Sequence, residues 1–201
     1  MNTLFKKDYL ILILIAIILI FKTYERNIVW NDKLSLWKDV FEKSPYKARG
    51  HNDLGNAYRN KGLTEMAIKH YEIALNLNPE YADAYVNIGN AYRDVGQEEK
   101  VEEYYLMAIR LNPSLIEAHN NLALIYANKG IIDKAIYHYK YAISLNPFLS
   151  EPHFNLGLTY LKINDVGNAI LEFEKAMTLN PDHPYARSFI EYLYNQKNFK
   201  P

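Results

Sequence analysis

Histidine is the residue type in this sequence best suited to binding a metal ion, and most of the histidines fall at regular spacing. One set, separated by multiples of 34 residues, contains His51, His119 and His153. A second set, separated by twice that period, contains His70 and His138. Zinc ligands must all lie about 2 Å from the ion. Residues related by such a period lie on different packed helices about 10 Å apart, so we predict that these histidines hold no common metal.

The motifs that catalysis and cofactor binding usually require are missing from the sequence. There is no HExxH zinc motif, GxSxG nucleophile elbow or phosphate-binding loop, and the carboxylates are scattered. There is no cysteine, which excludes disulfides, thiolate zinc sites and a cysteine nucleophile. Lys+Arg and Asp+Glu both number 23, so the basic excess of a nucleic-acid-binding protein is lacking. We predict no enzyme activity, no cofactor and no nucleic-acid partner.

Acidic residues gather at one place in the sequence. The cluster consists of Glu98, Glu99, Glu102 and Glu103. At helical spacing these side chains share a face, which favours a solvated helix surface; a docking site for a partner is the alternative.

Regularly spaced prolines indicate the helical repeats that would position any binding residues. Five of them, each 34 residues from the next, are Pro45, Pro79, Pro113, Pro147 and Pro181. Other residue types recur with the same 34-residue period, and each recurring position is called a column below. In chain order the columns are Leu or Ile followed by Gly or Ala, then Tyr, then Ala or Val, then Tyr or Phe, then Ala. An internal period of this length is typical of a helical solenoid. In these columns the chain resembles the tetratricopeptide repeat (TPR) proteins. His51 and the residues equivalent to it in the other repeats occupy the position where tryptophan is commonest in that family.

Each column has a physical reason. Small residues beside Leu or Ile allow two helices to approach closely, and the aromatic residues fill the gaps between helices. Gly62, Gly96 and Gly130 stand where the first helix of a pair must end in a left-handed residue. Asn164 takes that place in the last pair, because asparagine tolerates this conformation. The proline stops the second helix, since it lacks an N–H group.

The predicted fold class is therefore all-α: a right-handed TPR solenoid of helix-turn-helix repeats with an N-terminal transmembrane helix. The predicted segments are an anchor (1–25), a juxtamembrane half-repeat (26–47), repeat one (48–81), repeat two (82–115), repeat three (116–149), repeat four (150–183) and a C-terminal capping helix (184–201). The half-repeat should contain one helix, Asp32 to Lys43, whose apolar face is Leu36, Trp37, Val40 and Phe41. The cap should bury Ala186, Phe189, Ile190 and Leu193.

The resemblance to TPR proteins implies a concave groove that binds a peptide or protein segment. In that family, residues on the first helix of each repeat, around the Leu-Gly pair, face the groove. Asparagine side chains there can donate and accept hydrogen bonds to an extended backbone. The predicted protein-binding groove consists of Arg49, Asn52, Asp53, Asn56, Arg59, Asn87, Asn90, Arg93, Asn121, Leu124, Phe154, Asn155, Leu158 and Leu161. Asparagine is also an ordinary consensus residue at these positions, so a purely structural role is the alternative.

An apolar run near the N-terminus predicts a membrane anchor. Residues 9–21 read YLILILIAIILIF, and the stretch 4–24 would span about 31 Å as a helix if the flanking lysines extend toward water. A cleaved signal peptide and a buried helix of a soluble fold are the alternatives. No small-x-small cleavage site follows the run, and a helix without a polar face needs burial on all sides. We expect a single-pass protein of the cell membrane.

The segment after this run resembles a junction in a larger family. Polytopic glycosyltransferases of the transmembrane O-mannosyltransferase kind carry a last transmembrane helix, this junction and then TPR repeats. The matching landmarks here are Arg26, Asn27, Trp30, Leu36, Trp37, Ser44 and Pro45. The resemblance implies that the repeats face the extracytoplasmic side, although the positive charges flanking the run are nearly balanced. The catalytic part of such enzymes has no counterpart here.

We therefore expect a membrane-anchored TPR scaffold whose partner is a protein or peptide segment. The alternative function is the non-catalytic tail of a split or truncated membrane glycosyltransferase, with a polytopic membrane transferase as partner.

Overall fold

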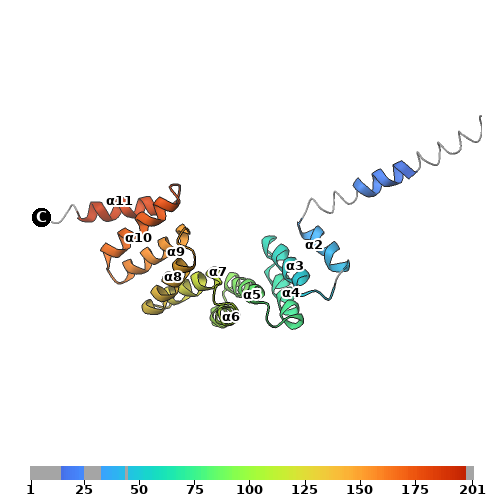
Figure 1. The fold of residues 1–201 in the computed structure, drawn as a ribbon, viewed down its shortest axis with the longest axis horizontal. Helices are drawn as coiled ribbons and strands as arrows, with labels where there is room; N and C mark the ends of the chain where they lie inside the picture. The colour runs from blue at the N-terminus through green and yellow to red at the C-terminus, as the bar shows by residue number, and fades with distance from the viewer. Residues whose placement is uncertain (1–14, 25–32, 44, 198–201) are drawn as a thin grey trace, which may run out of the picture. The chain divides into compact units, whose positions relative to one another are not determined.

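A computed structural model describes residues 15–24, 33–43 and 45–197, and these residues form α-helices joined by turns, without a strand among them (Figure 1). Backbone contacts divide the chain into two units, residues 1–79 and residues 80–201. The first unit contains α2 (Lys33–Lys43), α3 (Ala48–Asn60) and α4 (Thr64–Leu77). The second contains α5 (Ala82–Asp94), α6 (Glu98–Leu111), α7 (Ile116–Asn128), α8 (Ile132–Leu145), α9 (Ser150–Lys162), α10 (Val166–Leu179) and α11 (Ala186–Lys197). The predicted all-α solenoid is confirmed, while its handedness stays a prediction.

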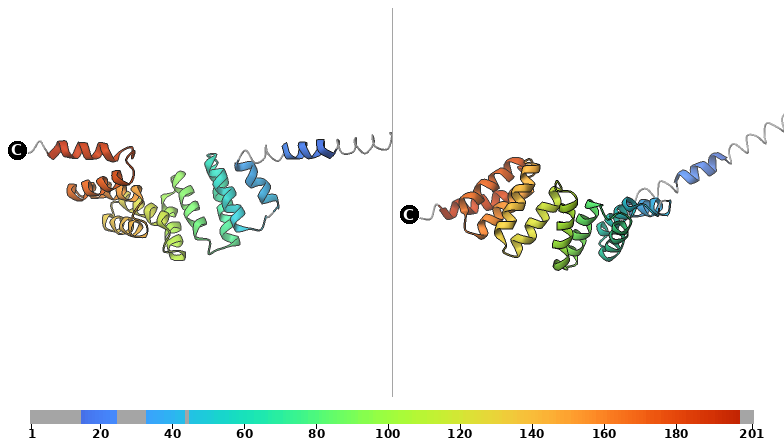
Figure 2. Two further views of the ribbon diagram at one scale, coloured as in Figure 1. Left: turned by 45° about the horizontal axis from the view of Figure 1, so that its top comes forward. Right: turned by 60° about the horizontal axis from the view of Figure 1, so that its bottom comes forward.

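Helical hairpins are the building blocks of both units. The helices pair in sequence order as α3 with α4, α5 with α6, α7 with α8 and α9 with α10, and two further views show the hairpins of the second unit following one another (Figure 2). Three glycines end the first helices with φ of 75° at Gly62, 74° at Gly96 and 75° at Gly130. Asn164 replaces glycine in the fourth hairpin with φ of 59°. The predicted left-handed residues are thus confirmed at all four turns.

Close approach between the two helices of a hairpin depends on the small residue in the first helix. A Cβ atom added to Gly89 would lie 2.8 Å from the Tyr105 ring, and one added to Gly157 would lie 2.7 Å from the Phe173 ring. Real Cβ atoms do not come this close to a ring, so glycine makes room for the aromatic residue. Those aromatic residues are fully buried, as are the leucines and isoleucines beside the small residues. This layer is the core of each hairpin.

The second helices end where the sequence predicts. Each stops two residues before its proline, and the intervening asparagine is extended. In α4, for example, the backbone N–H of Asn78 donates to the carbonyl oxygen of Ala74 at 2.9 Å. Pro79 then follows in a turn, because it has no N–H group with which to continue the helical pattern.

Single helices flank the hairpins. In the first unit α2 packs against α3, with Leu36 and Trp37 half-buried; the side chains of Val40 and Phe41 lie outside the described residues. In the second unit α11 packs against α10 and buries Ala186, Ile190 and Leu193. Its Phe189 ring stacks on Phe173 with centroids 5.3 Å apart. The apolar face predicted for the capping helix is thus confirmed.

The predicted membrane anchor falls largely outside the described residues. Residues 15–24 are helical, whereas residues 1–14 and 25–32 are not described. Within the part of the chain that the structure describes, no helix combines the length and the apolar character needed to cross a bilayer. The anchor predicted at residues 1–25 therefore stays a prediction.

Candidate functional site

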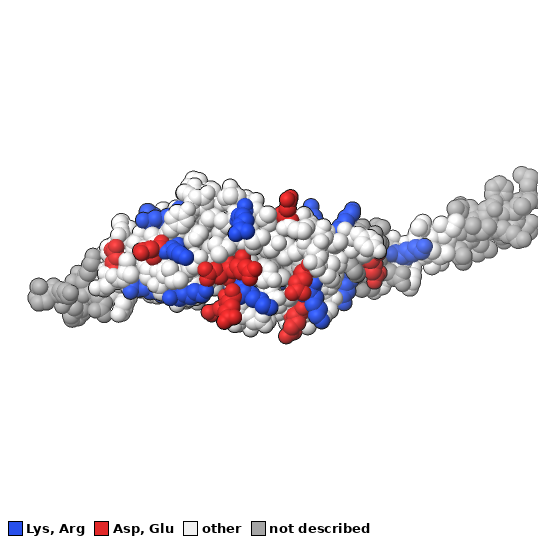
Figure 3. Space-filling view, turned by 90° about the horizontal axis from the view of Figure 1, so that it is seen from below, with Lys and Arg blue, Asp and Glu red and all other residues white. Residues whose placement is uncertain are grey.

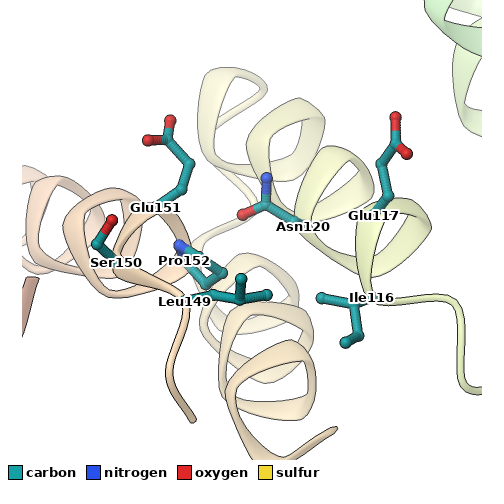
Figure 4. Close-up of a pocket in the computed structure, with 7 residues that line it drawn as sticks. All are labelled: Ile116, Glu117, Asn120, Leu149, Ser150, Glu151 and Pro152. Atoms are coloured by element: carbon teal, nitrogen blue, oxygen red, sulfur yellow. The ribbon is translucent and has the colours of Figure 1, made fainter. Parts of the chain in front are cut away.

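A pocket lies between α7 and α9 on the second unit. It has a volume of about 320 Å³ and is open to solvent. Its lining residues come from the first turns of the two helices and from the turn before α9: Ile116, Glu117, Asn120, Leu149, Ser150, Glu151 and Pro152. Figure 4 shows the aliphatic side chains of Ile116, Leu149 and Pro152 along one side of the pocket. The pocket is thus a hollow with an apolar floor on the first helices of repeats three and four.

Carboxylates stand at the rim of this pocket. The side chains of Glu117 and Glu151 rise on either side of Asn120 (Figure 4). The Glu151 side chain is 65% exposed, and its Oε2 atom lies 3.8 Å from Nε2 of His183. Between the two carboxylates, the buried Oδ1 atom of Asn120 has no hydrogen-bond partner. Because no lysine or arginine lines the pocket, its charged groups are all acceptors of hydrogen bonds.

A buried hydrogen-bond network holds α5, α6 and α7 beside this pocket. Asn90 is 3% exposed, and its Oδ1 atom accepts from the Tyr105 hydroxyl at 2.7 Å and from Nδ2 of Asn121 at 2.9 Å. Its own Nδ2 group donates to Oε1 of Glu117 at 2.9 Å. At the other end of α7, the Lys162 ammonium group of α9 donates to the carbonyl oxygen of Ala127 at 2.7 Å. These bonds fix the surface on which the pocket lies.

The structure gives the predicted groove residues of the second unit different environments. Asn90 and Asn121 lie in the buried network, so their amides are already bonded within the fold. Phe154, which we predicted as a groove residue, is only 7% exposed and packs against Phe173, Phe189 and His183. The half-buried members are Asn87, Arg93, Leu124, Asn155, Leu158 and Leu161. Whether any of these residues contacts a partner stays a prediction.

The predicted groove residues of the first unit also make internal contacts. Asn52 is buried, and Oδ1 of Asn56 accepts from the Tyr71 hydroxyl at 2.7 Å. The exposed Arg49 guanidinium group lies 3.7 Å from Oδ2 of Asp53. Burial raises the pKa of Asp53, and the positive charge of Arg49 opposes that rise. Arg59 is half-buried on the same helix.

Histidines of the two columns meet in the α3–α4 and α7–α8 hairpins, which the sequence analysis missed. Nδ1 of His51 lies 3.1 Å from Nδ1 of His70, and Nδ1 of His119 lies 2.9 Å from Nδ1 of His138. The metal prediction considered only histidines of the same column, which are separated by multiples of the repeat period. The signal that could have found the pairs is the equal separation of 19 residues in both hairpins.

Backbone contacts define the tautomers of these pairs. Nε2 of His51 lies 3.0 Å from the carbonyl oxygen of Pro45, and Nε2 of His119 lies 3.1 Å from that of Pro113. Because a carbonyl oxygen only accepts, these Nε2 atoms carry hydrogen, and in the neutral ring Nδ1 must then accept. His70 and His138 therefore donate from Nδ1. Each pair would lose this hydrogen bond if both rings were protonated, because neither Nδ1 atom could then accept.

The lowered pKa values of His70, His119 and His138 favour the neutral state of these rings. Burial lowers the pKa of His119, and the Pro113 carbonyl opposes this effect. Burial, with the neighbouring His119 and Lys134 charges, lowers the pKa of His138 to about 4. Burial and His51 likewise lower the pKa of His70. Among the described residues no group of three or more His, Cys, Asp or Glu side chains could hold a metal ion.

The acidic cluster lies on α6, around which acidic side chains gather in Figure 3. Three of its members, Glu99, Glu102 and Glu103, border a shallow hollow with Leu106 and Met107. Glu102 accepts from the Lys129 ammonium group, which lowers the pKa of its carboxyl group. This face is therefore partly neutralised by contacts within the fold.

None of the residues that line the pocket was among the predicted groove residues, including Glu117, Asn120 and Glu151. Asn120 lies two residues before the Leu122-Ala123 pair, as the predicted groove residue Asn52 lies two residues before the Leu54-Gly55 pair. Comparison of this position between the repeats could have found it. The glutamates could be found only as first-turn residues of α7 and α9.

Comparison with protein families finds the repeats over most of the chain. A family model described as TPR repeat matches residues 44–96. Models described as Tetratricopeptide repeat match residues 82–115, 116–149 and 150–183.

Curated relatives are similar to one part of the chain. A Protein O-mannosyl-transferase of Caenorhabditis elegans is 36% identical over 77 residues, which are 38% of this chain and 11% of that protein. Protein O-mannosyl-transferase TMTC1 of Homo sapiens is 31% identical over 72 residues, which are 36% of this chain and 8% of that protein. The chain thus matches about a tenth of the length of these relatives.

Solved structures share the fold. MamA is 27% identical with a TM-score of 0.65, and the match covers 74% of this chain and 87% of that one. YrrB, described as a TPR protein with an unusual peptide-binding site, is 24% identical with a TM-score of 0.65, covering 82% and 84%. A thermophilic TPR protein of Thermus thermophilus, TTC0263, is 22% identical with a TM-score of 0.67, covering 81% and 89%. The last two likenesses concern the fold alone.

Proposed function

Since this chain belongs to the tetratricopeptide repeat family, we propose that it is a non-catalytic scaffold that binds an extended segment of a partner protein. The binding surface is the face of the second unit formed by the first helices α5, α7 and α9. The observation that carries this proposal is the pocket between α7 and α9, which opens on that face. Binding pockets in proteins are typically concave, mainly apolar and edged by a few polar groups.

Half-buried leucines continue the surface beyond the pocket. Leu124 on α7 and Leu158 on α9 occupy equivalent positions after the small residue of each hairpin and are half-buried. Apolar side chains of this kind usually contribute most of the affinity at a protein interface, whereas polar contacts set the register. A partner segment would therefore contact both leucines and place one side chain in the pocket.

The buried network prepares this surface for binding. Asn90 connects α5, α6 and α7 through three hydrogen bonds, so the helices already hold one arrangement before a partner arrives. A surface that needs no ordering loses less free energy on association. The predicted asparagines thus support binding by positioning the helices.

The test begins with a partner captured by crosslinking from native membranes, which is identified, purified and titrated against the full-length chain. The variant Leu124→Ala with Leu158→Ala should weaken binding by about 2 kcal/mol, because two apolar contacts are truncated. The matched control, Leu106→Ala with Met107→Ala, changes the same kind of side chain on α6. If only the control weakened binding, the partner would occupy α6 and the proposal would be wrong.

A second candidate function follows from the similarity to O-mannosyl-transferases. The chain would hold acceptor proteins for a separate polytopic transferase, as the non-catalytic part of a split enzyme. The observation that favours it is the 36% identity over 77 residues to the Caenorhabditis elegans transferase. Co-purification of the full-length chain with a multi-spanning transferase, and loss of mannose from its acceptors on deletion of the chain, would support this function. Unchanged mannosylation after deletion would contradict it.

Membrane anchoring by residues 1–25 is also proposed, from the apolar run at residues 9–21. The full-length chain should stay with membranes during carbonate extraction and keep its N-terminus. With the repeats on the extracytoplasmic side, an external protease should degrade them in intact cells. Release by carbonate would contradict the anchor, and protection from the protease would contradict the orientation.

A further inference from the structure

The pocket between α7 and α9 has a chemistry that suits one class of side chain. We infer that it is the subsite for a lysine or arginine side chain of the bound segment. This inference rests on the proposed function and names the feature of the partner that the pocket selects. It combines an apolar floor, an acidic rim and a buried acceptor, which are argued in turn.

The floor fits the stem of a long basic side chain. Ile116, Leu149 and Pro152 offer aliphatic surface along one side of the pocket (Figure 4). Lysine and arginine have several methylene groups before the charged end, and these groups favour apolar surfaces while the charge stays near water. Asp and Glu side chains lack so long an apolar stem, and the rim would repel their charge.

The rim fits the charged end. Glu117 and Glu151 are the charged residues that line the pocket, and both are exposed. Nδ2 of Asn90 donates to Oε1 of Glu117, which leaves the second carboxylate oxygen of Glu117 to accept from a ligand. Carboxylates in the first turn also stabilise a helix N-terminus, but that role does not require a hollow between the two glutamates. The opposite charge of an ammonium or guanidinium group complements this rim.

The Asn120 amide adds a further acceptor on the pocket wall. Its Oδ1 atom is buried and without a partner, which is uncommon because unpaired buried polar atoms cost free energy. Lysine and arginine are rich in donors and have no acceptor. A small rotation of the amide toward an entering N–H group would give this oxygen a partner, and an apolar ligand would leave it unpaired.

The experiment uses a library of random dodecapeptides displayed on phage and selected on the full-length chain. Enriched peptides are synthesised twice, once unchanged and once with the shared basic residue replaced by norleucine, which keeps the stem but removes the charge. Each version is titrated against the native chain and against the variant Glu117→Gln with Glu151→Gln, whose side chains keep their shape. The control variant is Glu99→Gln with Glu103→Gln on α6, which removes the same charge.

We expect the enriched peptides to share one lysine or arginine. The norleucine version should bind the native chain about tenfold more weakly. The Glu117→Gln with Glu151→Gln variant should weaken the basic peptide equally and leave the norleucine version unchanged. Equal weakening by the α6 control would show a general effect of charge and overturn the inference, as would enriched peptides without a shared basic residue. If no peptide were enriched at all, the proposed function itself would fail.

Discussion

The hairpin of α7 and α8 and the hairpin of α9 and α10 share one backbone plan but join their helices with different side chains. In repeat three, His119 meets His138; at the same positions in repeat four, Nδ1 of His153 lies 2.6 Å from Oε2 of Glu172. The ammonium group of Lys175 donates to the other oxygen of that carboxylate at 2.9 Å. Protonation of both rings would remove the hydrogen bond of the first pair, whereas the carboxylate of the second pair can accept from the imidazole in either charge state.

Two further positions distinguish the same hairpins. Repeat three has Ala123 where repeat four has Gly157, and Gly130 where repeat four has Asn164. Both hairpins nevertheless bury their central aromatic residue completely, Tyr139 in one and Phe173 in the other. The comparison shows that this backbone tolerates several local solutions, each with its own dependence on pH and on side-chain size. Because repeats interact mainly with their neighbours, those differences should be measurable hairpin by hairpin.

The largest expected effect concerns the close contact between Gly157 and the Phe173 ring in repeat four. Gly157→Ala should destabilise repeat four by about 1–3 kcal/mol, because the new Cβ atom would lie 2.7 Å from the buried Phe173 ring. The measurement is hydrogen exchange of backbone amides in α9 and α10 of the full-length chain. Protection in α7 and α8 is the internal control, because Ala123 already carries a Cβ atom there. Unchanged protection in α9 and α10 would mean that Phe173 can move aside at no cost.

Acid should destabilise repeat three before repeat four. The folded-state pKa of His138, about 4, lies below its unfolded value of 6.5, so the unfolded chain binds more protons between these values. Stability from this histidine is therefore complete above pH 6.5 and is lost as the pH falls toward 4. Allowing for partial exposure, we expect a loss of about 1–2 kcal/mol at pH 5.

The check for acid sensitivity is exchange protection at pH 7 and pH 5, corrected for the intrinsic exchange rate. Amides of α8 should lose protection relative to those of α10, whose Glu172 can pair with a protonated His153. Equal losses in the two helices would contradict the role assigned to the histidine pair.

A single substitution should convert one hairpin into the other. His138→Glu would place a carboxylate opposite His119, as in repeat four, and the α7–α8 hairpin should then keep its protection at pH 5. We expect a gain of about 1 kcal/mol over the native chain at that pH, with little change at pH 7, because the carboxylate stabilises a protonated imidazole. The reciprocal change, Glu172→His, should transfer the acid sensitivity to repeat four. Persistence of the sensitivity in α8 after His138→Glu would assign it to another group.

The elements were predictable from sequence because their signals are local. The prolines at a fixed period, the left-handed residues and the small residues all act within one hairpin, and the structure has them in the predicted roles. The groove was less predictable, because it depends on how far each helix is rotated about its axis. Asn90 and Asn121, 31 residues apart, turn toward each other and are buried, whereas the neighbouring Asn120 lines the pocket.

The histidine pairs illustrate the same limit. Their members are separated by 19 residues, a distance set by the turn between two helices rather than by the repeat period. Phe154 is a second case: its position in α9 resembles an exposed groove position, but the cap α11 brings Phe189 against it. The environment of Phe154 therefore depends on a neighbour that its own repeat does not contain.

The smallest expected effect concerns the left-handed residue that ends the first helix. Asn164→Gly in repeat four would relieve a non-glycine residue at φ 59°, which stabilises the fold by about 1 kcal/mol or less. Glycine also gives the unfolded chain more freedom, which costs about 0.4–1 kcal/mol. These terms oppose each other, so the net change in α9–α10 stability should lie within about 0.5 kcal/mol. Asn164→Ala keeps the positive φ but replaces asparagine, which tolerates that conformation, with alanine, which does not. This variant should therefore lower the stability of α9–α10 more than Asn164→Gly does. Exchange protection of α9 and α10 distinguishes the two variants. A marked gain in protection from Asn164→Gly would contradict the prediction, because it would mean that positive φ costs the asparagine more free energy than glycine loses through its greater freedom in the unfolded chain.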